Sequence, residues 1–549
     1  MKVYAALAIF AFAVLAAFAV WFGGLNQDEG WYLYAAQLVG EGKMLYRDFA
    51  FTQGPHLPKF YKSFAWVWAD GRGLLGARIF TATIGLVGMM LAAGLARMLA
   101  GHRSVLSTSR SALSTEQTAK IAGVIAFLLL GCNLYHIYYT AIPKTYALAQ
   151  LWVMMGFCLL ANGLAERSSA INASPDGRTA SPDGRTAFGH SFLVGAGMAL
   201  GYAAGTRISL GILLAVCGVG LLLNFKRFGW SFLWFGLGGA LTLALVYGPF
   251  LLDAGAREGL VAAQRYHAAR GGFDAVFTVG SLSRLVRWYL PVFVLLGLGL
   301  AEHSSAIFTR SSVLFTSRSG LPMREDGQAV PDQSATRNFL LWLMGLGFLA
   351  VFAVQMMAPH PYEDYQVPVM GLLAVVAAVL VSELRGAPLL ALGLAWGCSF
   401  GSPLLEQWMT NGQDRFWTLK KEKSELAQLR DAARLVEALD PGGKTLFTQD
   451  TYLAVETGRR VPDGLEMGPF SILTDDAWRA LIDRAECPVA ALSGYTFAIN
   501  PPVCDERPFD RQMDLWSRVK TRYDRVTVLN DFGQHATPLL ILKRKAAAE

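Results

Sequence analysis

Two adjacent carboxylates, Asp28 and Glu29, come directly after the first long apolar run of the chain. A carboxylate can remove a proton from a substrate as a general base. Charges at a membrane boundary are costly, so such residues are there for function or because water reaches the end of a helix. Position alone does not decide between these two interpretations. Trp31, Tyr32 and Tyr34 follow closely and are more typical of a membrane-interface belt than of a sugar-binding platform.

Arg207 is the most informative cation, because it lies between two apolar runs at 192–204 and 208–223. An arginine in such a place either extends its charge to the membrane interface or lines a polar cavity. Arg78, near the start of another apolar run, could anchor its segment or form an internal salt bridge. Lys144 stands in a short polar turn between two further runs.

Four histidines lie in four different loops, and together they raise the question of a zinc site. They lack the paired spacing of metal ligands, so we interpret most of them as polar loop residues at the membrane interface. His360 is kept as a candidate substrate contact, because Tyr362 and Tyr365 follow it closely. The four are His56, His136, His267 and His360.

The composition indicates that a lipid bilayer is the main solvent of the chain. Of the 549 residues, 53% are hydrophobic and only 16% are charged, which is far from the average for a water-soluble domain. The formal charge of +7 does not point to nucleic acid, because much of the Lys and Arg lies in short loops between apolar runs. The six cysteines show no metal-binding spacing.

About eleven apolar runs have the length that a helix needs to cross a membrane, about 20 residues. These runs must be helical, because the bilayer offers the backbone no other hydrogen-bond partner. We expect the first, Val3–Gly24, to be retained, since no convincing signal-peptide cleavage site follows it. The others are Leu74–Leu99, Ile121–Asn133, Thr145–Leu164, Phe192–Ala204, Ile208–Leu223, Trp230–Leu252, Leu285–Leu300, Phe339–Met357, Val367–Val381 and Pro388–Leu405.

The distribution of Lys and Arg predicts that the N-terminus lies in the cytoplasm. The first loop, 25–72, and the C-terminal region are then extracytoplasmic. Two repeats support this sidedness, since SPDGRTA at 174–180 returns at 181–187, and SVLSTSRS at 104–111 returns with one change at 312–319. Insertions of this kind survive where little packing depends on the backbone. All of them fall in predicted cytoplasmic loops, so we expect the working face to be the other one.

Residues 1–410 therefore form a predicted transmembrane domain, and 411–549 a predicted soluble α/β domain. Apolar residues recur at helical spacing over 424–439, and short runs that are typical of strands follow. An extracytoplasmic compartment would allow Cys487 and Cys504 to form a disulfide. The expected strands are Thr445–Phe447, Val489–Leu492, Val526–Leu529 and Leu539–Leu542.

The pattern in the first loop extends beyond the Asp-Glu pair. After the Asp-Glu pair come AAQLVGEGKMLYRDF at 35–49, a Gln-Gly-Pro turn at 53–55 and GLLGAR at 73–78; GYAAGTR follows at 201–207, and Tyr362, Tyr365 and Pro368 open a late run. This combination resembles the GT-C membrane glycosyltransferases. Within them it is most similar to bacterial relatives of the dolichyl-phosphate-mannose protein mannosyltransferases and the lipid A aminoarabinose transferases. The resemblance covers most of the membrane part and is weak in the C-terminal domain.

The resemblance implies an inverting hexosyl- or pentosyltransferase with a polyprenyl-phosphate-linked sugar as donor. The acceptor would be a hydroxyl group of an envelope glycolipid, glycan or protein. By motif position Asp28 matches the catalytic base and Glu29 its companion, while a cation must stabilise the departing phosphate. The candidate residues for binding the donor phosphate and the substrates are Arg207, Lys144, Arg78, His360, Tyr362 and Tyr365.

One departure from the family concerns metal ions. Lys144 stands where several relatives have an acidic residue, so the resemblance predicts an enzyme without a metal or other cofactor, and a divalent metal stays an alternative. The same resemblance, with the Ala- and Arg-rich composition, predicts a multi-pass protein of the bacterial inner membrane with a periplasmic C-terminal domain.

Two other classes of protein remain open. A secondary transporter or lipid flippase is also polytopic and basic on its cytoplasmic side, but tends to carry ionisable residues near the middle of the bilayer. A catalytically silent scaffold for envelope assembly would not need the pair of Asp28 and Glu29.

Overall fold

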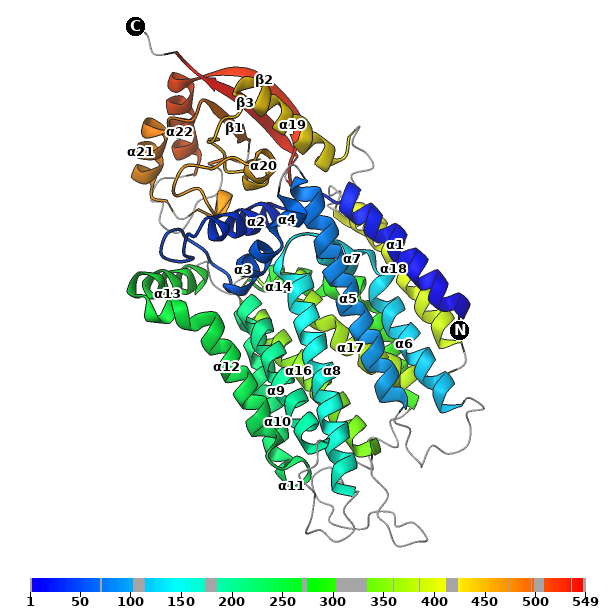
Figure 1. Ribbon diagram of the computed structural model, residues 1–549. Coiled ribbons are helices and arrows are strands. Elements are labelled where there is room, and N and C mark those ends of the chain that lie inside the picture. The colour runs from blue at the N-terminus through cyan, green and yellow to red at the C-terminus, as the bar shows by residue number, and fades with distance from the viewer. Residues whose placement is uncertain are drawn as a thin grey trace, which may run out of the picture.

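The structure is a computed structural model in which long helices form a bundle and a smaller mixed domain covers one end of it (Figure 1). Helical elements dominate, and the strands are confined to the C-terminal region. The residues that the structure describes are 2–69, 72–101, 114–172, 185–268, 274–302, 333–358, 360–384, 386–410, 423–471, 473–494, 496–497, 508–534 and 536–546.

Six of the described helices are long and apolar enough to cross a membrane, so the chain is a multi-pass membrane protein. Two bent pairs, with angles of 71° and 73°, raise the number to eight if each pair is one span. The six are α1 (Lys2–Phe22), α5 (Gly73–Gly101), α8 (Thr145–Asn172), α12 (Ser231–Leu252), α16 (Gln333–Met356) and α17 (Val367–Val381). The pairs are α6 (Thr115–Gly131) with α7 (Leu134–Ala141), and α14 (Ala275–Trp288) with Leu290–Glu302.

Three further predicted spans fall on helices that do not meet the same criteria of length and hydropathy. They are α9 (Arg185–Thr206), α10 (Ile212–Leu223) and α18 (Ala387–Thr410). The count of eleven spans therefore stays a prediction. The octamers 104–111 and 312–319 and the first heptad copy lie outside the described residues.

The packing of the bundle explains why its helices lack a polar face. Every residue of α17 is buried, so this helix is apolar on all sides. Small residues allow α9 and α12 to approach closely: a Cβ atom on Gly197 would lie 2.0 Å from the Phe235 carbonyl oxygen. On the other helix, a Cβ atom on Gly238 would lie 2.0 Å from the carbonyl oxygen of Val194. Such contacts replace the hydrophobic effect as the source of helix association in lipid.

The first loop is folded into three short helices that lie between the bundle and the C-terminal domain (Figure 1). Asn26 begins the first of them with a capping box, in which its side chain accepts from the Asp28 N–H and the Glu29 side chain accepts from the Asn26 N–H. The three are α2 (Gln27–Gly40), α3 (His56–Ser63) and α4 (Ala65–Trp68).

The C-terminal domain combines helices with a three-stranded antiparallel sheet of order β1-β3-β2. The predicted strand at 445–447 is not part of that sheet and makes only isolated bridges, one of them between Phe447 and Ala490. Cys487 is buried and Cys504 lies outside the described residues, so their pairing stays a prediction. The elements are α19 (Glu425–Leu439), α20 (Thr451–Thr457), α21 (Asp475–Arg484), β1 (Val489–Ser493), α22 (Pro508–Arg522), β2 (Tyr523–Phe532) and β3 (Thr537–Arg544).

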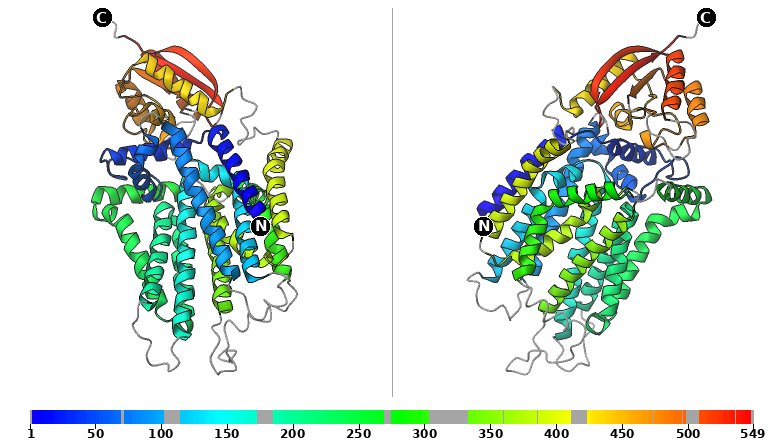
Figure 2. Two further views of the ribbon diagram at one scale, coloured as in Figure 1. Left: turned by 45° about the vertical axis from the view of Figure 1, so that its right-hand side comes forward. Right: turned by 180° about the vertical axis from the view of Figure 1, so that it is seen from behind.

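The C-terminal domain and the first loop share one hydrophobic core. Figure 2 shows the arrangement of their ribbons from two further sides. The Gln27 N–H donates to Gln534 Oε1 at 3.0 Å, and the Val461 N–H donates to the Tyr34 hydroxyl at 2.9 Å. Gly30 is required at this contact, because a Cβ atom there would lie 2.2 Å from the Tyr452 nitrogen. The domain is therefore docked on the helix that carries Asp28.

Shorter elements complete the described chain. They are the 3₁₀ helices η1 (Ile208–Gly211), η2 (Glu363–Gln366) and η4 (Gly468–Phe470), and the helices α11 (Phe225–Phe228) and α13 (Ala254–Ala268).

Candidate active site

Asp28 lies in the first turn of α2, where backbone N–H groups and the helix dipole favour a negative charge. Its Oδ1 atom accepts a hydrogen bond of 3.0 Å from the Trp31 indole N–H. Its Oδ2 atom lies 2.8 Å from Lys144 Nζ, and its side chain is 22% exposed. The carboxylate is therefore fixed in orientation while one part of it stays accessible.

Lys144 joins two carboxylates that are far apart in the sequence. Its ammonium group lies 2.8 Å from Asp28 Oδ2 and 3.1 Å from Asp364 Oδ2. The Tyr146 hydroxyl also donates to Asp364 Oδ2, at 2.8 Å. Burial alone would lower the pKa of Lys144, but Asp28 and Asp364 outweigh it and raise this pKa well above its usual value. Lys144 is therefore a permanent cation at this position.

Glu29 and Arg78 form a second, separate ion pair. Arg78 Nε donates to Glu29 Oε2 and Arg78 Nη2 to Glu29 Oε1, both at 2.7 Å. The remaining N–H groups of Arg78 donate to the carbonyl oxygens of Val20, Gly23 and Gly24. Both side chains are 0% exposed. The structure thus brings Arg78 to Glu29 and to the end of α1.

Arg207 lies at the end of α9, where the chain turns into η1. Its guanidinium carbon is 5.0 Å from the centre of the Tyr146 ring and 4.6 Å from that of Tyr365. Lys144 Nζ lies 4.9 Å from the centre of the same Tyr146 ring. Tyr146 therefore connects the two cations, and its hydroxyl connects both to Asp364.

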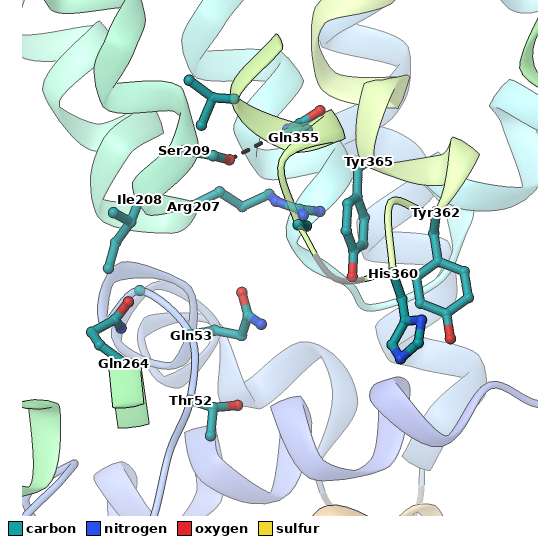
Figure 3. Close-up of a pocket in the computed structure, with 13 residues that line it drawn as sticks. Thr52, Gln53, Arg207, Ile208, Ser209, Gln264, Gln355, His360, Tyr362 and Tyr365 are labelled. Atoms are coloured by element: carbon teal, nitrogen blue, oxygen red, sulfur yellow. Dashed lines mark hydrogen bonds between the residues drawn. The ribbon is translucent and has the colours of Figure 1, made fainter. Parts of the chain in front are cut away.

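Arg207 lines a cavity of about 210 Å³ at this end of the bundle (Figure 3). Three other predicted residues, His360, Tyr362 and Tyr365, line it too. The rest of the wall consists of amide, hydroxyl and apolar groups: Thr52, Gln53, Gly54, Ile208, Ser209, Gln264, Val354, Gln355 and Ala358. The structure thus gathers four of the eight predicted site residues around one cavity, and it places Lys144, which pairs with Asp28, over the Tyr146 ring.

A divalent metal would need several ligand side chains close together. Among the described residues, no three His, Cys, Asp or Glu side chains come together as a possible metal site. The Lys144 ammonium already lies between the two nearest carboxylates. His56 is also unsuited, because its Nε2 atom accepts from the Trp152 indole at 3.1 Å and burial lowers its pKa to about 4.

Sequence reasoning missed Asp364 as a member of this site, although it named Tyr362 and Tyr365 on either side. The signal was an acidic residue at the opening of an apolar run, a costly place for a charge. The partner that explains it, Lys144, is 220 positions away, and no local pattern connects the two. Gln53 belongs to the Gln-Gly-Pro turn that the sequence analysis singled out, whereas Gln355 carried no signal of its own in the sequence.

Comparison with known proteins identifies the fold. No protein-family model and no curated protein matches the sequence. Among solved structures, the chain is similar to ArnT from Cupriavidus metallidurans bound to undecaprenyl phosphate, with a TM-score of 0.54 and 13% identity over 100% of this chain and 98% of that one. The chain has the GT-C fold.

Two further solved structures match with lower TM-scores. The apo form of the same ArnT has 16% identity and a TM-score of 0.47 over 98% of this chain and 97% of that one. The apo oligosaccharyltransferase from Archaeoglobus fulgidus has 10% identity and a TM-score of 0.43 over 89% of this chain and 70% of that one. Helices too short or too polar to count as spans by themselves are thus part of a GT-C fold that extends over the whole chain.

Proposed function

We propose that this chain is an inverting glycosyltransferase that moves a sugar from a polyprenyl-phosphate-linked donor to a hydroxyl group of an envelope acceptor. The observation that carries the proposal is that Lys144, which pairs with Asp28, and Arg207, which lines the cavity, both lie over the ring of Tyr146. A structure with the same fold, ArnT, was solved with undecaprenyl phosphate bound. One base and two cations are the groups that this reaction needs.

In the proposed reaction Asp28 is the general base. A carboxylate oxygen of Asp28 takes the proton of the acceptor hydroxyl group. At the same time the oxygen of that hydroxyl group attacks the anomeric carbon of the donor sugar. The bond from the anomeric carbon to the phosphate oxygen breaks, and polyprenyl phosphate leaves with the electron pair. Attack on the face opposite the leaving group inverts the configuration. Arg207 stabilises the negative charge that develops on the phosphate, because its guanidinium can donate two parallel hydrogen bonds.

Lys144 has two functions in this proposal. It holds Asp28 at 2.8 Å and so fixes the orientation of the base. It also supplies, between Asp28 and Asp364, the positive charge that a divalent cation would supply in a site built of carboxylates alone. We therefore propose that transfer needs no metal ion.

Glu29 and Arg78 act as positioning residues rather than as groups that touch a substrate. Their ion pair ties the first turn of α2 to the carbonyl groups at the end of α1. All five N–H groups of Arg78 are already used, which leaves none for a phosphate. This proposal changes the roles that the family resemblance implied for both residues.

The proposed location is the bacterial inner membrane, with the cavity and the C-terminal domain on the periplasmic side. The distribution of Lys and Arg in the loops supports this orientation. Ile208 and Val354 line the cavity and are 46% and 39% exposed on the apolar surface of the bundle, where the chain of a lipid donor would leave it. A reporter that is active only in the cytoplasm should be silent when fused after Glu549.

The alternative of a transporter or flippase is less favoured, because the ionic groups around Lys144 gather at one end of the bundle. The decisive experiment incubates the purified protein with undecaprenyl-phospho-glucose and an envelope extract as acceptor. A glycosyltransferase releases undecaprenyl phosphate and forms a new glycoside, which mass spectrometry detects. A flippase moves the intact lipid across vesicles and releases nothing, and that result would overturn the proposal.

A further inference from the structure

The cavity beyond Arg207 has a wall of neutral polar groups that the reaction itself does not use. Among the described residues that line it, amide side chains come from three separate segments, at Gln53, Gln264 and Gln355. Ser209 and Thr52 add hydroxyl groups, and no Asp or Glu is among these lining residues. Figure 3 shows these amide and hydroxyl side chains around the space in front of Arg207. Such a wall offers hydrogen bonds without a formal charge.

Gln355 is the member of this wall that best indicates a ligand. Its side chain is 3% exposed, and its Nε2 group donates to Ser209 Oγ at 3.3 Å. Within the described part of the chain, its Oε1 atom has no hydrogen-bond partner. A buried amide oxygen without a partner is costly. A ligand hydroxyl group that donates to Gln355 Oε1 would remove that cost.

The cavity is large enough for a ligand of the size of one sugar ring. Its volume of about 210 Å³ is several times the roughly 30 Å³ that one water molecule takes. It lies below the lower end of ligand pockets for drug-sized molecules, about 300 Å³. One sugar ring next to a phosphate group suits such a space better than an oligosaccharide does.

The charges nearby exclude an ionised sugar. A cationic amino sugar would need a free carboxylate, but Asp28 and Asp364 are held by Lys144. Glu363, the other carboxylate close to the lining residues, is held by Arg284 at 3.0 Å and by the Ser281 hydroxyl. An anionic sugar would compete with the donor phosphate for Arg207.

We propose that this wall binds the sugar of the donor as a single uncharged, hydroxyl-rich ring, and that Gln355 is a specificity-determining residue that accepts a hydrogen bond from one of its hydroxyl groups. This inference rests on the proposed function and deepens it, because it names the class of sugar that is transferred.

The test compares two lipids that differ only in the sugar, undecaprenyl phosphate and undecaprenyl-phospho-glucose, bound to the full-length protein in nanodiscs. Gln355→Met keeps the length of the side chain and removes the acceptor, so the glucosyl lipid should bind about tenfold more weakly. Binding of undecaprenyl phosphate should be unchanged. Arg207→Ala should weaken the binding of both lipids, because both carry the phosphate.

A matched control is available in Gln150→Met. Gln150 is also fully buried and carries the same amide group, but it does not line the cavity. This variant should leave the ratio of the two affinities at the wild-type value. A Gln355→Met protein that binds both lipids as the wild type does, or loses both equally, would overturn the inference and leave the proposed function standing. A wild-type protein that binds neither lipid would overturn both.

A second measurement needs no substitution and therefore does not depend on the folding of a variant. Undecaprenyl phosphate that carries glucosamine or glucuronic acid competes with the glucosyl lipid for the wild-type protein. We expect the glucosyl lipid to bind at least about tenfold more tightly than either charged lipid, since a charge buried without a partner is strongly unfavourable. Equal or tighter binding of a charged lipid would contradict the proposal.

Discussion

The Lys144 ammonium lies 2.8 Å from Asp28 Oδ2, between this carboxylate and that of Asp364. Asp364 completes the group at 3.1 Å. The base, its cation and the second carboxylate come from the first loop, the turn before α8 and the start of α17. The chemistry of the site therefore depends on the packing of three segments.

Asp28→Asn should lower the turnover number by a factor of about 10² to 10⁴, because an amide cannot take the acceptor proton. The Trp31 indole can still donate to the Asn oxygen, and Asp364 still pairs with Lys144, so the protein should fold. Transfer from undecaprenyl-phospho-glucose and a thermal melt measure the two effects. A folded Asp28→Asn protein with wild-type turnover would remove Asp28 from the mechanism.

Asp364→Asn tests which of the two carboxylates, Asp28 or Asp364, is the general base. The side chain of Asp364 is 9% exposed and that of Asp28 is 22% exposed, so an acceptor reaches Asp28 more easily. The loss of turnover should therefore be much smaller for Asp364→Asn than for Asp28→Asn. The reverse order would make Asp364 the base.

Lys144→Glu should convert the enzyme to metal dependence. The new side chain would face Asp28 and Asp364, and three carboxylates around one point are ligands for Mg²⁺ or Mn²⁺. We expect wild-type activity to survive EDTA and that of Lys144→Glu to require added Mn²⁺. Lys144→Met, which carries no charge, should stay inactive with or without the metal. Loss of wild-type activity in EDTA, restored by Mn²⁺, would show that Lys144 does not replace a metal.

Glu29→Gln should lower the stability of the fold more than it lowers the turnover number. It leaves the fully buried Arg78 without its counter-charge, which costs about 3–5 kcal/mol for a buried ion pair. The melting temperature should fall clearly, while turnover per folded molecule should fall far less than in Asp28→Asn. Combined with Arg78→Met, the effect on stability should be smaller than the sum of the single effects. Additive effects would mean that the two side chains act independently.

Asp450 should make the stability of the C-terminal domain depend on pH. Burial raises the pKa of its carboxyl group from 3.8 to about 6. The folded state then binds more protons than the unfolded state between pH 4 and 6, so stability falls as the pH rises through this window and stays low above it. The difference in stability across this window amounts to about 3 kcal/mol, because the pKa rises from 3.8 to about 6.

Asp450→Asn keeps an oxygen that can accept from the Tyr452 hydroxyl but cannot ionise. It should therefore melt at a higher temperature than the wild type at pH 7.5. The advantage should shrink below about pH 6 and disappear near about pH 4. Melts over this pH range check the sign, and a constant difference at all pH values would assign the effect to packing instead.

Glu425→Ala should loosen the contact between the C-terminal domain and the first loop. Glu425 Oε2 accepts from the Leu25 N–H, three residues before Asp28, and the side chain is buried. An unpaired buried N–H costs about 1–3 kcal/mol, so both the melting temperature and the turnover number should fall. Arg434→Ala on the same helix is the control, because Arg434 is 79% exposed. Full activity of Glu425→Ala would mean that docking of the domain does not position α2.

The sequence by itself determined that the chain is a membrane protein, and it determined where the first helix of the first loop begins. Apolar runs of bilayer length are a local property, since a segment in lipid must satisfy its own backbone. For the same reason the predicted spans fall on helical segments, although the one at 285–300 crosses the bend between α14 and Leu290–Glu302. Asn26 and Glu29 lie within one turn of each other, so the capping box that begins α2 follows from neighbouring residues.

Only the tertiary structure decided which charges meet. Arg78 and Lys144 are both candidate phosphate ligands in the sequence. In the structure Arg78 is paired with Glu29, and Lys144 lies between Asp28 and Asp364. Salt bridges between segments 49 and 220 residues apart depend on how helices pack, and no local spacing encodes that. The free energy of a charge depends on its partner and its burial. For that reason the roles of these residues could be assigned only once the helices were in place.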